Sequence, residues 1–150
     1  MQMRPRGLVR MCFCLFLGTA AVAQTAAEKP TESPHIAGPH GLEGWALDWP
    51  LPNDQNHGER YPNTLLIARR GRVIRRIEGG PFVWKWMFWA DGRQVAYEEG
   101  SLHFNRWCTL VDVATGRQIA SRDCFSEKLS AHTPAWEKAL VADESLPAKP

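Results

Sequence analysis

Signatures of catalysis and metal binding are missing from this 150-residue sequence. It contains neither the Gly-x-Ser-x-Gly elbow of serine hydrolases nor a glycine-rich phosphate-binding loop. The histidines are scattered, and no Cys/His or His/carboxylate spacing typical of a metal site accompanies them. They are His35, His40, His57, His103 and His132. We therefore expect no cofactor and no bound metal.

Cysteine is scarce as well. Two of the four cysteines lie in the N-terminal segment, which leaves Cys108 and Cys124 on either side of a Thr115-Gly116 turn. A hairpin closing at this turn brings side chains on neighbouring strands within about 4.5–5.5 Å, which a disulfide can bridge. We predict a Cys108–Cys124 disulfide, with two buried free thiols as the alternative. A cysteine pair also suits an oxidising compartment.

The N-terminal apolar run, residues 8–17, is too short to cross a bilayer as a helix. Basic residues accompany it, namely Arg4, Arg6 and Arg10. Ala21-Val22-Ala23 has the small-x-small pattern of a signal-peptidase site. Residues 1–23 are therefore predicted to be a signal peptide, and the protein is predicted to be exported to the periplasm or the medium. An N-terminal anchor that is retained is the alternative.

A strong excess of either charge is absent once this segment is set aside. Three of the 18 basic residues leave with it, all 16 acidic residues stay, and the remainder carries a net charge of −1. The basic character of the whole chain thus comes from the predicted signal peptide. The charge balance gives no reason to expect a nucleic-acid partner, and we expect no transmembrane span after cleavage.

Composition divides the rest of the chain into three parts. Residues 24–43 are rich in Ala, Pro, Glu, Thr, Ser and Gly, and they are predicted to be a flexible leader because they can bury little apolar surface. A β-meander domain is expected over 44–125, opening with a short strand in which Trp45, Leu47 and Trp49 alternate with other residues. Residues 53–64 are predicted to be a loop. A C-terminal helix and tail are expected over 126–150.

Three similar phrases mark the meander: Gly71-Arg72, Gly92-Arg93 and Gly116-Arg117. Each follows a residue suited to a turn and opens a run that is apolar or β-branched, as at the tip of a hairpin. Hairpins that follow one another without helices form an antiparallel sheet. The predicted fold class is mainly β, with about six to seven strands in a single blade-like or half-barrel meander. The strands are expected at 65–69, 72–78, 82–89, 93–98, 102–113 and 117–123.

The C-terminal segment has the pattern of a short helix. Thr133 is a suitable N-cap and Pro134 suits the first helical position. Trp136, Ala139 and Leu140 fall on one helical face, which could cover an open edge or face of the sheet.

Part of the meander resembles a known repeat. Residues 89–97 read Trp-Ala-Asp-Gly-Arg-Gln-Val-Ala-Tyr. They resemble the W-x-x-D-G-x-x-[IV]-A-[FY] phrase of WD40-like β-propeller repeats of the TolB type, one residue short between Trp and Asp. Residues 110–117 resemble the strand and turn that follow in the same repeat, and the likeness covers about residues 65–124. The chain is too short to form the several blades that close a propeller ring. The resemblance therefore implies a blade-like sheet and no particular ligand.

The most aromatic strand, 82–89, offers two faces. Phe82, Trp84, Trp86 and Phe88 are expected to form the core, because a domain of this size needs a dense one. The functional alternative is an exposed aromatic platform for a glycan or a peptide. Its candidate binding residues are Trp89, Lys85 and Trp107.

Arginines are concentrated in the hairpin that precedes the 82–89 strand. They include Arg69, Arg70 and Arg72, with Arg75 and Arg76 close behind. A solvated hairpin face is one interpretation. The other is an anion-binding patch for lipopolysaccharide, a phosphate-bearing polymer or an acidic partner.

These observations favour a small exported, non-enzymatic module for binding or envelope-associated interaction. The partner could be a protein or a polysaccharide, and open sheet edges could also pair in a homo-oligomer. The alternative is a hydrolase of surface polymers that uses Asp91 with Glu98 or Glu99. That alternative requires a cleft in which these carboxylates converge.

Overall fold

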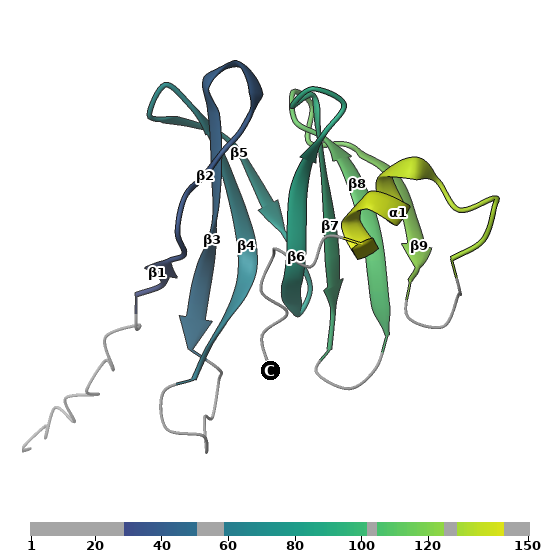
Figure 1. The fold of residues 1–150 in the computed structure, drawn as a ribbon. Helices are drawn as coiled ribbons and strands as arrows, with labels where there is room; N and C mark the ends of the chain where they lie inside the picture. The colour runs from purple at the N-terminus through teal and green to yellow at the C-terminus, as the bar shows by residue number, and fades with distance from the viewer. Residues whose placement is uncertain (1–28, 51–58, 102–104, 125–128, 143–150) are drawn as a thin grey trace, which may run out of the picture.

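A computed structural model describes residues 29–50, 59–101, 105–124 and 129–142. They form two antiparallel sheets and one short helix (Figure 1). The first sheet comprises β1 (Thr31–Glu32), β2 (Ile36–Ala37), β3 (Leu42–Pro50), β4 (Arg60–Arg69) and β5 (Arg72–Glu78). The second comprises β6 (Phe82–Trp89), β7 (Gln94–Gly100), β8 (Arg106–Asp112) and β9 (Gln118–Asp123). A 3-10 turn, Pro39–Gly41, precedes β3, and helix α1 is Ala135–Ala142. The predicted signal peptide lies outside the described residues.

The predicted fold class is confirmed: the chain is mainly β, its strands are antiparallel, and a short helix follows them. The meander, however, is divided in two after β5, because the sheets run β1-β3-β4-β5 and β6-β7-β8-β9. The physical reason lies in the apolar faces. Both halves carry large apolar residues on one face, and stacking those faces buries them from water together.

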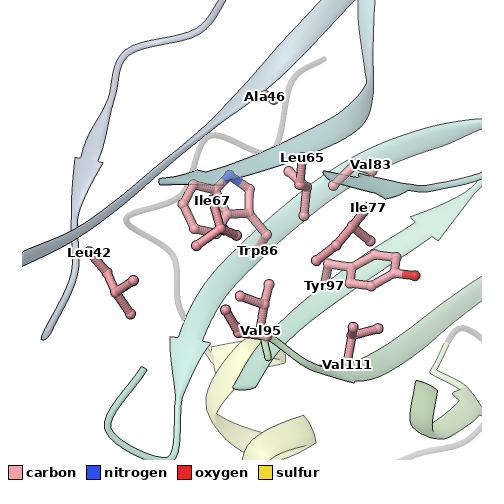
Figure 2. Packing of buried hydrophobic residues seen from close by; sticks show 11 residues of the cluster. Leu42, Ala46, Leu65, Ile67, Ile77, Val83, Trp86, Val95, Tyr97 and Val111 are labelled. Carbon is pink, nitrogen blue, oxygen red and sulfur yellow. The ribbon is translucent and has the colours of Figure 1, made fainter. Parts of the chain in front are cut away.

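The core lies between the two sheets (Figure 2). Leu65 and Ile67 of β4 are fully buried, and they face Trp86 of β6 and Val95 of β7. Close approach of the sheets depends on Gly44 of β3, because a Cβ there would lie 2.5 Å from the Trp86 ring. The Trp86 ring therefore packs directly against the backbone of the opposite sheet.

The expected alternation along β6 is interrupted. The register shifts between Val83 and Lys85, so that Trp84 occupies a β-bulge. Val83 then joins Trp86 in the core, while Trp84 is only half-buried. The prediction that Trp84 belongs to the core face with Trp86 is therefore corrected by the bulge, which a strict two-residue period cannot anticipate.

Strands also form in part of the predicted leader. β1 and β2 both pair with β3, and the Ser33 hydroxyl accepts a hydrogen bond of 2.9 Å from the backbone N–H of Ala46. Their side chains are exposed. These residues are therefore ordered by backbone hydrogen bonds to β3, an edge strand without them. Apolar composition gives no indication of such pairing.

Other strand boundaries shift by a few residues. β4 begins at Arg60, inside the predicted 53–64 loop, because Arg60 to Thr64 continue the pairing with the end of β3. β8 is shorter than the predicted 102–113 strand. Asn105 precedes it with φ of 56°, a left-handed conformation that turns the chain directly before β8. Residues 102–104 lie outside the described part.

Helix α1 covers the outer face of the second sheet. Trp136 and Leu140 pack on Ala96, Cys108 and Leu110. The helix starts one residue later than predicted, since the Pro134 carbonyl accepts the first helical hydrogen bond, from Lys138. The Thr133 hydroxyl instead accepts a 2.8 Å hydrogen bond from the backbone N–H of Ser130.

The predicted Cys108–Cys124 disulfide is confirmed, and it joins β8 to the end of β9 beneath the helix. We expect Cys108→Ala/Cys124→Ala to lower the free energy of unfolding by about 3 kcal/mol, because the bridge closes a loop of about 15 residues. Urea denaturation measures this. In a Cys12→Ser/Cys14→Ser background, the denatured, unreduced protein should titrate no thiols. Two reactive thiols would contradict the assignment.

A buried phenol gives the fold a specific pH dependence. Burial, aided by the nearby Glu99 carboxylate, raises the pKa of Tyr97 to about 12, although a Thr109 hydrogen bond opposes the shift. An unfolded tyrosine ionises near pH 10. Stability from this group is therefore complete below about pH 10 and is lost as the pH rises through about 12. Urea denaturation across this range should show a decline of about 2–3 kcal/mol that Tyr97→Phe lacks. Equal declines in both proteins would contradict it.

Candidate functional site

Four turns gather at one end of the two sheets, the upper end in Figure 1, and we call this end the turn pole. It comprises residues 40–41 before β3, 70–71 between β4 and β5, 90–93 between β6 and β7, and 113–117 between β8 and β9. All four turns use positive φ, for example at Arg70 (53°) and Gly71 (75°). Glycine adopts this conformation without a Cβ penalty, which explains its place in each repeated Gly-Arg phrase.

Hydrogen bonds hold these turns against one another. The Arg75 guanidinium donates to the carbonyl oxygens of Val113, at 2.8 Å, and Ala114. The backbone N–H of Val113 in turn donates to the carbonyl of Arg93 at 2.9 Å. His40 Nε2 lies 2.7 Å from Asp91 Oδ2, and so joins the turn before β3 to the β6–β7 turn. The turn pole is therefore one continuous surface built from both sheets.

Positive charge dominates this surface. Five exposed arginines lie on it or directly beside it, and they are Arg69, Arg70, Arg72, Arg93 and Arg117. Two carboxylates accompany them, and both have local partners. Asp91 pairs with His40, while Asp112 accepts hydrogen bonds from the backbone N–H and the hydroxyl of Thr115.

The Asp112 carboxylate has a structural role in its turn. The backbone and hydroxyl hydrogen bonds from Thr115 lower the pKa of Asp112 below its ordinary value. The Thr115 hydroxyl also accepts a 3.2 Å hydrogen bond from the backbone N–H of Arg117. Asp112 thus fixes the backbone from which the Arg117 side chain projects.

Exposed apolar side chains stand beside the arginines. Val73 and Ile74, at the start of β5, are 46% and 38% exposed. Ile119, near the start of β9, is 43% exposed. The turn pole therefore presents exposed aliphatic side chains together with its arginines.

The structure separates the predicted arginine patch into two kinds of residue. Arg69 and Arg72 face each other across the β4–β5 hairpin, and Arg70 forms its tip, so these three are available at the turn pole. Arg75 is occupied by the Val113 and Ala114 carbonyls, and Arg76 pairs with Glu78. Arg93 and Arg117 join from the other two hairpins, and Arg93 also donates from Nε to the Ala90 carbonyl at 3.1 Å.

The predicted aromatic platform is not assembled. Trp89 packs at the edge of the cluster under helix α1, beside the turn pole. Trp107 is 45% exposed, but it pairs with Glu99 near the other end of β7. Because Trp107 shares its strand face with Val111 of the core, it also lies on the opposite side of the sheet from Trp89. Lys85 lies four residues from Trp89 in β6, a distance of about 13 Å along an extended strand. These three candidates therefore form no common site.

The three carboxylates of the hydrolase alternative do not converge either. Asp91 is in the turn pole, whereas Glu98 and Glu99 are at the far end of β7 and point to opposite faces. Glu98 lies 2.9 Å from the Arg106 guanidinium. Glu99 accepts hydrogen bonds from the Thr109 hydroxyl, at 3.0 Å, and the backbone N–H of Gly80, at 2.8 Å. The described residues therefore give this alternative no geometric support.

The gathering of the Gly-Arg turns was not predicted, although a signal for it exists. The three phrases occupy every second connection of an antiparallel meander, after β4, β6 and β8. Alternate connections of such a meander lie at the same end. Counting strands between repeats, in addition to residues, would have placed Arg72, Arg93 and Arg117 together.

Within the described ranges, His, Cys, Asp and Glu form no group of three or more that could hold a metal ion. In the same ranges, no helix has the length and apolar character needed to cross a bilayer. Comparison with protein families, with curated proteins and with solved structures finds no match to this chain.

Proposed function

We propose that this protein is an exported, non-enzymatic module whose turn pole binds a phosphate-bearing lipid surface of the cell envelope. One observation carries the proposal: the three repeated Gly-Arg turns lie at one end and present five exposed arginines there. Guanidinium groups bind phosphate oxygens through paired hydrogen bonds, and several of them together attract an anionic surface.

The neighbouring aliphatic side chains favour a lipid surface over a soluble polyanion. Val73, Ile74 and Ile119 would bury exposed apolar area at the boundary between headgroups and acyl chains. A soluble acidic polymer offers no such region. Export is supported by the disulfide, which suits an oxidising compartment.

Binding to vesicles tests this proposal. We expect the protein to sediment with phosphatidylcholine vesicles that contain phosphatidylglycerol and to stay in solution with pure phosphatidylcholine. Binding should weaken strongly between about 0.1 M and 1 M salt, since the Debye length falls from about 10 Å to about 3 Å.

Competition with a soluble polyanion shows whether the negative charge that the turn pole binds belongs to a lipid surface or to an acidic polymer. Heparin should compete with the anionic vesicles only weakly, because it gives the aliphatic residues nothing to insert into. Equal affinity for heparin and for the vesicles at matched charge would overturn the lipid assignment in favour of a polymer. Failure to bind either would overturn the proposal as a whole.

A further inference from the structure

An imidazole and a carboxylate meet at the turn pole. His40 Nε2, in the turn before β3, lies 2.7 Å from Asp91 Oδ2, in the β6–β7 turn, and the two side chains are 68% and 69% exposed. The contact spans 51 positions of the sequence and joins a turn of the first sheet to a turn of the second. Both groups are therefore open to solvent and to any surface that the turn pole meets.

Both partners sit on left-handed backbone. His40, Ala90 and Asp91 have φ of 55°, 49° and 59°, a conformation that is unfavourable for residues with a Cβ. The backbone N–H of Arg93 closes the β6–β7 turn on the Ala90 carbonyl at 3.3 Å. Unfavourable conformations persist where contacts around them hold them, and they concentrate at functional sites. The His40–Asp91 contact is thus one of those that hold the turn from which Arg93 projects.

The charge of this contact depends on pH, because histidine is the side chain that ordinarily gains its charge between pH 8 and pH 5. Two turns meet His40. The β6–β7 turn carries Asp91 and Arg93, and the β4–β5 hairpin carries Arg69 and Arg70. Asp91 is the one carboxylate among these four residues. A neutral imidazole leaves its negative charge in place, whereas an imidazolium forms an ion pair with it.

We propose that protonation of His40 strengthens the binding of the turn pole to an anionic lipid surface. This inference rests on the proposed function and adds a regulator to it. A proton from solvent binds the imidazole beside Asp91, and the formal charge of the pair changes from −1 to zero. The exposed arginines then attract the lipid phosphates against one opposing charge fewer.

The other carboxylate of the turn pole does not take part in this change. Hydrogen bonds from the backbone N–H and the hydroxyl of Thr115 lower the pKa of Asp112. Asp112 therefore stays ionised when His40 gains its proton, and the change in charge is confined to the His40–Asp91 pair.

Sedimentation with phosphatidylglycerol vesicles at about pH 7.5 and about pH 5.5 tests the proposal, since the phosphodiester of this lipid stays ionised over that range while histidine titrates. We expect about fivefold tighter binding at the lower pH, the effect of one unit of charge near an anionic surface. His40→Asn should remove most of this difference, and asparagine tolerates the φ of 55°. The matched control is His132→Asn, which changes an exposed histidine outside the turn pole and should keep the difference.

A second variant reproduces the change in charge without a proton. Asp91→Asn removes the carboxylate, and asparagine again tolerates the left-handed backbone. At about pH 7.5 this variant should bind the vesicles about fivefold more tightly than the unaltered protein, as the unaltered protein does at the lower pH. Unchanged affinity of the folded variant would contradict the role of the His40–Asp91 pair.

The outcomes separate this inference from the proposed function. Vesicle binding that is the same at both pH values, or that depends on pH equally in His40→Asn, would overturn the inference and leave lipid binding by the turn pole intact. Absence of vesicle binding at both pH values would overturn the proposed function and the inference together.

Discussion

Neutralising the β4–β5 hairpin should weaken binding to anionic vesicles about 100-fold. The variant combines Arg69→Gln, Arg70→Asn and Arg72→Gln, with asparagine at position 70 because its φ is 53° and asparagine tolerates that conformation. Each arginine near an anionic surface contributes about 1 kcal/mol, and every 1.4 kcal/mol is tenfold in affinity. Sedimentation with phosphatidylglycerol vesicles, titrated over lipid concentration, measures the loss.

A matched variant tests whether the location of the arginines or the net charge of the protein governs binding. Lys29→Gln/Arg76→Gln/Lys138→Gln also removes three positive charges, but from residues outside the turn pole. Its affinity should fall less than about threefold, because charges beyond a Debye length of the bound surface are screened. Equal losses in the two variants would show that overall charge, and not the turn pole, governs binding.

Trp86→Ala should lower the free energy of unfolding by about 3–5 kcal/mol, a large part of the total for a domain of this size. Trp86 is buried between the sheets, contacts Phe88 edge to face at 5.5 Å, and approaches Gly44 so closely that no Cβ would fit there. Its removal leaves a cavity that neither sheet can fill without moving. The midpoint and slope of urea denaturation measure the change.

Trp107→Ala provides the control for this experiment. Trp107 is 45% exposed and lies outside the core cluster, so the cost should stay near about 0.5 kcal/mol, the usual limit for surface substitutions. Similar losses for Trp86→Ala and Trp107→Ala would contradict the packing of the two sheets around Trp86.

Local sequence signals were sufficient for most of the secondary structure. β5 and β6 have the predicted bounds, since turn residues mark both ends of each strand. The division into two sheets could not be predicted in this way, because it depends on which apolar faces meet across the molecule. The bulge at Trp84 could not be predicted either, since Phe82 to Phe88 read as an unbroken alternation of aromatic and other residues. The likeness to a WD40-like blade stays a prediction.

The candidate site was predictable only in part. Arg69, Arg70 and Arg72 stand out in sequence because they are neighbours along the chain. Arg93 and Arg117 join them only through topology, and the engagement of Arg75 by the Val113 carbonyl depends on a contact across 38 positions.

Hydrogen exchange of the full chain, with and without phosphatidylglycerol vesicles, tests most directly whether the turn pole is the lipid-binding surface. We expect slowed amide exchange in residues 70–74, 90–93 and 113–119 and unchanged exchange in helix α1. Slowed exchange confined to the helix or to β1 and β2, with the three hairpin tips unaffected, would contradict the account.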